Sequence, residues 1–498
     1  MSSAALEGWR ASFPARGSTL SLIVSLLACS AVAIGFAAAS PANGHWFLVP
    51  VTLCGALAGA DALDWLRGRR DRLDPFGLLG LFGVHFFFLS PLLHVHWDYW
   101  LLYVAAPGDW RPWLGLMASL NLLGLVAYRF SRHLRLKTPP EREWTVRWTF
   151  VGSRLRLVLP AFLLLTGGLQ LWVYQSQGSI LGYIQAFEDS AEAFRGMGWV
   201  FVISESFPVI AFISFTVLAR RYAFLRRWTP VVVALALFFV AKMIFGGLRG
   251  SRANTIWAMF WAAGIVHLMI RPISRKFIAV GVAGMLLFVY AYGFYKGVGT
   301  EALTALQGAE ARADLESRTR RSVEGNVLGE FARADVQAFL LYRLLAAEGD
   351  YPLAMGRTYV GALAQLVPES IWAGRPPTKV KEGTELQYGR DTYNKHFYSV
   401  RQYGVGGEAL LNFGPMAVPF AYLLFGLGVG GLRRASGRLA EGDTRLYLLP
   451  FMTYLTFVCL LMDSDNITIV LIKNGVIPLA LIALCSRRER VPATEASA

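Results

Sequence analysis

Apolar residues in this chain form long continuous runs rather than alternating with polar residues. Twelve runs are each long enough to cross a bilayer as an α-helix, which needs about 20 residues for a hydrocarbon core of roughly 30 Å. A transmembrane β-barrel would instead alternate apolar and polar positions. The pattern therefore predicts an all-α polytopic membrane protein with about twelve transmembrane helices. The expected spans are 20–39, 45–61, 75–93, 112–130, 155–174, 198–219, 229–247, 253–270, 277–295, 406–432, 446–462 and 467–485.

One polar segment of about 110 residues, from Lys296 to Gln402, interrupts these runs. Its apolar positions recur at helical spacing from Glu324 to Glu348 and from Thr358 to Leu366, which predicts a large helical extracytoplasmic lobe. The chain then divides into four regions. They are transmembrane helices one to nine in 1–295, the lobe in 296–405, helices ten to twelve in 406–485, and a tail in 486–498.

Charge adds a prediction of topology. The formal net charge of +15 could indicate nucleic-acid binding. The basic residues, however, fall in alternate short loops, as the positive-inside rule describes for cytoplasmic loops. We therefore expect no nucleic-acid partner, both termini in the cytoplasm, and the lobe on the opposite side of the membrane. The expected cytoplasmic segments are 1–19, 62–74, 131–154, 220–228, 271–276, 433–445 and 486–498.

Six ionisable residues fall at membrane depth, where a charge costs at least a few kcal/mol. In the expected topology all six lie toward the outer surface, which favours a wet cavity open to the outside over a transport site at the midplane. The alternative is that each one extends to water from a helix end. These residues are Glu205, Lys242, Glu408, Asp463, Asp465 and Lys473.

The turn from Gly246 to Arg252 is the most informative short motif. It joins two membrane helices on the side that has few basic residues, yet it carries Arg249 and Arg252. Glycines allow close approach of a ligand, and arginine matches phosphate oxygens. The turn thus predicts an anion site at the membrane surface, although two ordinary surface arginines are the alternative.

A second motif lies where the chain returns to the membrane. Glu408 and Asn412 are four residues apart and therefore share one face of a helix. A carboxylate beside an amide suits a general base or a group that binds sugar hydroxyls. The alternative is a glutamate favoured near a helix start by the macrodipole.

These motifs, with the stretch between them, resemble the bacterial O-antigen or exopolysaccharide repeat-unit polymerases, the Wzy-type family. The resemblance covers roughly residues 200–430, and within it Glu369, Ala373 and Arg375 stand where the family pattern has arginine, proline and lysine. The segments that carry it are 247–252, 356–359, 367–376 and 407–415.

The resemblance implies a GT-C-like membrane glycosyltransferase that joins oligosaccharide repeats carried on undecaprenyl pyrophosphate at the periplasmic face. It implies no cofactor, nucleotide or metal. The expected partners are the lipid-linked oligosaccharide and membrane lipid, and a chain-length regulator is a further candidate partner. The spacing His94-x-His96-x-Asp98 is metal-like but has no convincing third ligand.

On this hypothesis Glu408 acts as the base, and Arg249 and Arg252 stabilise the leaving diphosphate. The competing functions are an O-antigen ligase, a lipid-linked sugar flippase or other transporter, and a non-catalytic assembly subunit. Further residues expected to bind substrate are Arg357, Arg401, Asn412, Lys242 and Glu330.

Overall fold

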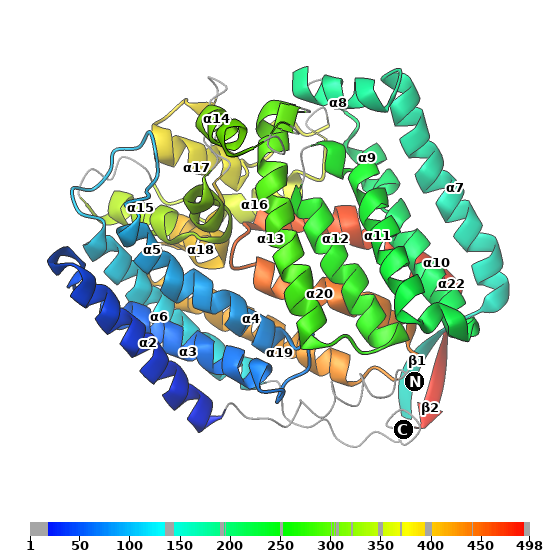
Figure 1. Ribbon diagram of the computed structural model, residues 1–498, viewed down its shortest axis with the longest axis horizontal. Coiled ribbons are helices and arrows are strands. Elements are labelled where there is room, and N and C mark those ends of the chain that lie inside the picture. Colours follow the sequence, from blue (N-terminus) through cyan, green and yellow to red (C-terminus); the bar gives the residue numbers. More distant parts are fainter. Residues whose placement is uncertain are drawn as a thin grey trace.

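The computed structural model is mostly helical (Figure 1). For a few residues the structure describes the backbone but not the side chain. These are residues 144–145, 187–189, 249, 252–253, 296–297 and 492. The structure describes residues 18–134, 144–189, 194, 196–249, 252–299, 301–302, 304, 308–319, 322–346, 352–368, 371–393, 401–440 and 442–492.

Eight of the twelve expected spans are helices long and apolar enough to cross a membrane, which supports an all-α membrane protein. The eight are α2 (Thr19–Ala39), α3 (Leu48–Leu66), α4 (Pro75–Val84) with η2 (His85–Leu89) and α5 (Ser90–His96), α6 (Arg111–Leu134), α7 (Gly152–Ser176), α9 (Gly198–Ser204) with α10 (Phe207–Arg221), α13 (Arg275–Val298), and α21 (Ser464–Val470) with η11 (Leu471–Gly475) and α22 (Val476–Cys485). In three of these eight, a break or a π-helical turn divides the helix into shorter segments.

The other four expected spans take different forms, so the count of twelve is not confirmed. Three are shorter apolar helices: α11 (Trp228–Ile244), α12 (Arg252–Ile265) with η6 (Val266–Ile270), and α20 (Leu449–Val458). The fourth, 406–432, divides into α18 (Gly404–Phe413) and α19 (Ala417–Gly437), and neither is among the eight candidate spans. Gly414 ends α18 with φ +81°, and Pro415 follows it.

The lobe contains α14 (Ala309–Thr319), η8 (Gly325–Glu330), α15 (Ala334–Leu345), α16 (Arg357–Ala364) and α17 (Lys379–Tyr388). The helix expected at 358–366 is confirmed as α16. The single helix expected over 324–348 was wrong, because η8 ends at Glu330 and Arg333 turns back to donate to the carbonyl oxygens of Gly329 and Glu330 at 3.3 Å. Such contacts satisfy the free carbonyls at a helix end.

Two strands were not expected from the sequence. The segments interpreted as a cytoplasmic loop and a tail pair as antiparallel strands, β1 (Trp144–Phe150) and β2 (Ser486–Pro492). The remaining helical elements are η1 (Pro41–Asn43), α8 (Ile180–Asp189), η4 (Ala223–Arg226), η5 (Gly247–Arg249) and η10 (Thr444–Tyr447).

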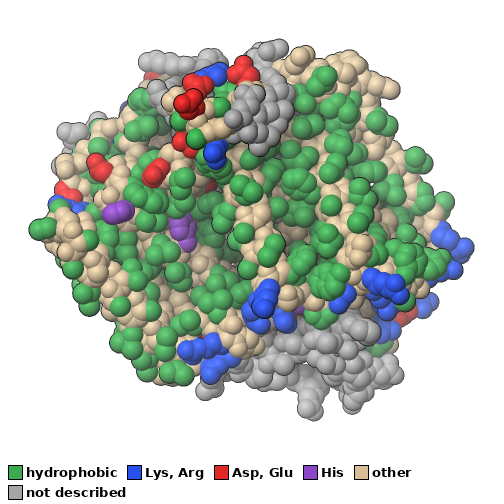
Figure 2. Space-filling view, in the orientation of Figure 1, with side chains coloured by type: hydrophobic (Ala, Val, Ile, Leu, Met, Phe, Trp, Pro, Cys, Tyr) green, Lys and Arg blue, Asp and Glu red, His purple; other side chains and the backbone are tan. Residues whose placement is uncertain are grey.

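The described parts of the expected cytoplasmic segments meet at one end of the molecule. Besides the β1–β2 pair, Arg433 Nε lies 2.8 Å from Asp74 Oδ2, and Arg275 Nε donates to the Trp65 carbonyl oxygen at 3.2 Å. On the face drawn in Figure 2, Lys and Arg side chains gather along the lower edge, and acidic side chains lie at the opposite end. Apolar side chains cover the surface between them, as expected of a membrane protein.

Part of the basic charge at this end is buried, which the topology rule did not predict. Arg70, Arg132 and Arg433 are almost fully buried around the ring of Phe76. Arg132 Nη1 lies 2.7 Å from Asp61 Oδ2, and Arg70 Nη2 lies 3.1 Å from Asp61 Oδ1. These side chains therefore join α3, α4, α6 and α19.

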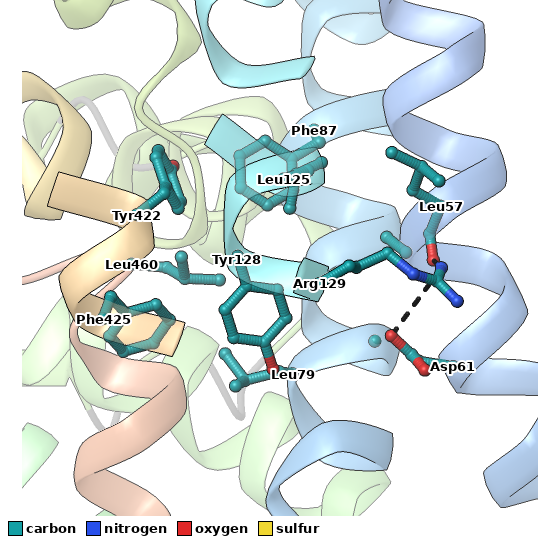
Figure 3. A pocket seen from close by; sticks show the side chains of 12 residues that line it. Leu57, Asp61, Leu79, Phe87, Leu125, Tyr128, Arg129, Tyr422, Phe425 and Leu460 are labelled. Atoms are coloured by element: carbon teal, nitrogen blue, oxygen red, sulfur yellow. Dashed lines mark hydrogen bonds and ion pairs between the residues drawn. The ribbon is translucent and has the colours of Figure 1, made fainter. Parts of the chain in front are cut away.

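A small hollow beside this cluster has mostly apolar walls. Figure 3 shows Asp61 facing Arg129 across it, with Nη1 and Oδ2 4.0 Å apart. The other labelled walls come from Leu57, Leu79, Phe87, Leu125, Tyr128, Tyr422, Phe425 and Leu460.

Candidate functional site

Glu408 lies on α18, almost fully buried, and joins three elements that are distant in the sequence. Its Oε1 accepts hydrogen bonds from Thr358 Oγ1 at 2.8 Å and from Ser464 Oγ at 2.6 Å. Its Oε2 accepts from the Ser464 backbone N–H at 2.6 Å. The carboxylate thus holds lobe helix α16 and the first residue of α21 against α18.

Asn412 belongs to the same network, as its spacing from Glu408 predicted. Its Nδ2 donates to Thr358 Oγ1 at 2.7 Å and to the Glu408 carbonyl oxygen at 2.8 Å. Its Oδ1 accepts from the Gly356 N–H at 2.9 Å. Gly356 has φ +85°, so glycine is suited to the turn that starts α16.

A second carboxylate, Asp463, lies next to Ser464 and is fully buried. Its Oδ1 accepts from the backbone N–H groups of Tyr403 at 2.8 Å and Gly404 at 3.0 Å. Its Oδ2 lies 3.1 Å from Lys379 Nζ, and that ammonium also lies 3.7 Å from the centre of the Tyr403 ring. Lys379 therefore brings a buried positive charge from α17 into the site.

Arg357 extends the site toward solvent. Its Nε lies 3.0 Å from Glu382 Oε1, and its side chain remains 44% exposed. Lys379 and Glu382 are three residues apart on α17, so both face this network from one side of the helix.

Glu408 and Asp463 place two carboxylates in one buried network, and Lys379 is the cation beside Asp463. A glutamate held in place by defined partners is a candidate general base.

The sequence also assigned Arg401 and Glu330 to substrate binding. Arg401 pairs with buried Asp335, and its Nη1 donates to the Gly329 carbonyl oxygen at 2.9 Å. The Arg401 carbonyl oxygen accepts from Lys379 Nζ, which connects it to the network through its backbone. Glu330 is half-buried at the end of η8, and its carbonyl oxygen accepts from Arg333.

Lys242 lies in a second polar cluster, formed around the buried carboxylate of Glu205. Lys473 Nζ lies 2.7 Å from Glu205 Oε2, and Asn254 Nδ2 donates to the same oxygen at 2.5 Å. Lys242 is fully buried and its Nζ donates to the Glu205 carbonyl oxygen at 3.2 Å. Glu205 stands at the break between α9 and α10.

The glycine-rich turn packs on this second cluster. Gly246 has φ +147°, and a Cβ added there would lie 2.7 Å from the Glu205 carboxylate. The hydroxyl of Tyr292 donates to the Gly247 carbonyl oxygen, and that of Tyr295 donates to the Leu248 carbonyl oxygen at 3.0 Å. The side chains of Arg249 and Arg252, which the sequence assigned to the diphosphate, lie outside the described residues.

One helix connects the two clusters. Ser464 contacts Glu408, and Lys473, nine residues later along α21 and η11, contacts Glu205. At 1.5 Å per residue these positions are roughly 14 Å apart along the axis. The cluster around Glu205 therefore lies deeper along this helix than the network around Glu408.

Sequence reasoning missed several members of the site. Lys379 and Glu382 lie on α17, and the polar sequence after Thr378 did not predict that helix. Thr358 and Ser464 gave no signal, because a hydroxyl acquires its role only from the carboxylate beside it. Asp463 was noted as an ionisable residue at the outer edge, but it was not assigned to the site.

A scan against protein-family models found no match to this chain, and neither a search of curated proteins nor a search of solved structures found one. The class that the fold supports is a helical membrane protein with a polar site beneath its lobe.

Proposed function

We propose that this chain is a membrane glycosyltransferase that joins lipid-diphosphate-linked oligosaccharide repeats into a polysaccharide. The observation that carries the proposal is the position of Glu408: a buried carboxylate, hydrogen-bonded to Thr358 and Ser464, lies where the lobe meets the helices. The resemblance of 247–252 and 407–415 to Wzy-type polymerases supports the same function. A GT-C-like fold with twelve spans, in a bacterial inner membrane with cytoplasmic termini, belongs to this proposal.

The reaction requires a base and a stabilised leaving group. An acceptor hydroxyl oxygen attacks the anomeric carbon of the donor, the bond from that carbon to the diphosphate oxygen breaks, and the hydroxyl proton passes to Glu408. Proton transfer to a positioned group contributes about 10²–10⁴-fold in rate. The lipid diphosphate leaves with the bonding electron pair, so it needs fixed positive charge nearby.

Several cations in the structure suit that second task. Lys379 is buried beside Asp463 and Arg357 is partly exposed at the edge of the network. Lys242 and Lys473 lie under the turn that carries Arg249 and Arg252. Since arginine binds phosphate oxygens in a planar, two-pronged geometry, an Arg249→Lys variant should retain little activity.

The test uses purified full-length protein in liposomes with lipid-linked repeats and no added nucleotide or metal. Polymer should form, and Glu408→Gln should abolish it while leaving the amount of folded protein unchanged. Glu310→Gln is the matched control, since Glu310 is an exposed glutamate on lobe helix α14 with no role in the proposed site. A Glu408→Gln protein that makes polymer normally would exclude Glu408 as the base.

The same assay separates the competing functions. An O-antigen ligase would transfer existing chains to a different acceptor without lengthening them. A transporter would move the lipid-linked repeat between leaflets without forming a glycosidic bond.

A further inference from the structure

The short lobe helix α16 has an apolar face that no described part of the protein covers. Its buried side carries Thr358, which contacts Glu408. Val360 and Leu363, three residues apart and so on one face, are exposed, and Leu363 is 66% exposed. In the loop after α16, Ile371 and Trp372 are also exposed, at 76% and 44%.

Contacts at both ends of α16 fix its depth. Near its start, the ring of Tyr359 stacks on that of Phe413 at the end of α18, with centroids 6.3 Å apart. Just beyond its end, Gln365 Nε2 donates to the Asp465 carbonyl oxygen at 2.9 Å. Asp465 lies in the first turn of the candidate span Ser464–Cys485. The helix therefore lies across the level where a membrane span begins.

The exposed face continues into surface that faces lipid in a membrane-spanning chain. Phe413, Met416, Phe420 and Leu424 follow one another at intervals of three, four and four residues and form an exposed apolar stripe from the end of α18 along α19. Ile469 and Leu471 are exposed on α21 and η11. An apolar surface this extensive is uncommon where a protein faces water.

The loop after α16 folds back on its own first residues, just beyond the end of the helix. Arg375 Nη1 donates to the Val367 carbonyl oxygen at 2.9 Å, and the Trp372 N–H donates to the Pro368 carbonyl oxygen at 3.1 Å. Tryptophan is enriched at the level of lipid headgroups, because its ring is apolar and its N–H seeks a polar partner.

We propose that α16 and residues 371–372 insert into the leaflet on the lobe side, so that the lobe rests on a lipid surface. The occupant of the exposed face is the headgroup and upper acyl-chain region of that leaflet. A helix with one apolar face commonly lies in this region. The proposal rests on the membrane-spanning fold and is independent of the proposed enzymatic function.

Spin labels on the full-length protein in phosphatidylcholine nanodiscs test this proposal. Cysteines introduced at Leu363 and Ile371 are labelled with a nitroxide, and its collisions with oxygen and with a water-soluble nickel chelate are compared. Leu164, 76% exposed on α7, is the lipid-facing reference, and Ser317, exposed on α14, is the water-facing reference. Unmodified protein measures any background from the four native cysteines.

The ratio of oxygen to nickel collisions at Leu363 and Ile371 should match that at Leu164 and exceed that at Ser317 several-fold. A ratio like that of Ser317 would place the face in water and overturn the proposal. Immobilised labels that neither reagent reaches would show that protein covers the face, which also overturns it. Both positions are exposed, so labelling should leave the fold intact, and an unchanged gel-filtration profile checks this.

Discussion

At the scale of single residues, Glu408 is a buried carboxylate held by defined partners. It accepts three hydrogen bonds and lies near a second buried carboxylate, Asp463. Lys379 supplies positive charge beside Asp463. The network therefore holds the Glu408 carboxylate in one orientation between α16, α18 and α21.

This network predicts that Asp463 matters for activity. Asp463→Asn removes the negative partner of buried Lys379, so the initial rate of polymer formation should fall. Initial rates per amount of folded protein measure the change.

Asp314→Asn on exposed α14 is the control, and its initial rate should match that of the unmodified protein. An unchanged rate in Asp463→Asn would mean that the buried ion pair is not needed for activity.

At the scale of elements, the close approach of α6 and α19 depends on glycine. A Cβ added at Gly430 would lie 2.2 Å from the Arg132 carbonyl oxygen, and one at Gly426 would lie 2.1 Å from Ser131 Oγ. Two glycines four residues apart thus let the helix backbones meet, as small residues do at membrane helix interfaces. The approach also brings Arg433 on α19 within reach of Asp74.

Adjacent glycines on α19 provide a matched test. Gly430→Ala should destabilise the fold by about 1–3 kcal/mol, because the added methyl group forces the helices apart. Gly431→Ala should be neutral or slightly stabilising, since nothing lies within 4 Å of a Cβ there. Thermal unfolding of the purified proteins in detergent gives both changes, and equal melting temperatures for the two variants would contradict the close packing.

At the scale of the whole molecule, polar networks occupy both ends and apolar surface lies between them. α19 has 21 residues and is therefore about 30 Å long, close to the thickness of a bilayer core. The Glu408 network lies beyond its first residue, and the Arg433–Asp74 pair lies near its last. The lobe and the β1–β2 sheet should consequently lie on opposite sides of the membrane.

Cysteine labelling tests this arrangement. Ser317→Cys on the lobe should react with a membrane-impermeant maleimide added to intact spheroplasts. Arg490→Cys on β2 should react only after permeabilisation, because we expect that end in the cytoplasm. Reaction of both positions from outside would rule out the proposed topology.

The sequence by itself determined the class of helical membrane protein, eight of the twelve spans that it predicted, and the position of Glu408 and Asn412 on one helix face. These depend on continuous apolar length and on four-residue spacing, which are local properties. The grouping of the basic segments at one end was also predictable, since it follows from counting membrane crossings.

Only the tertiary structure decided which distant groups meet. Thr358, Ser464 and Lys379 join Glu408 and Asp463 because α16, α17 and α21 pack beside α18. The β1–β2 pairing likewise joins residues more than 300 positions apart. A hydrogen bond or ion pair depends on distances of a few ångströms, and over long sequence separations those distances are set by helix packing rather than by local pattern.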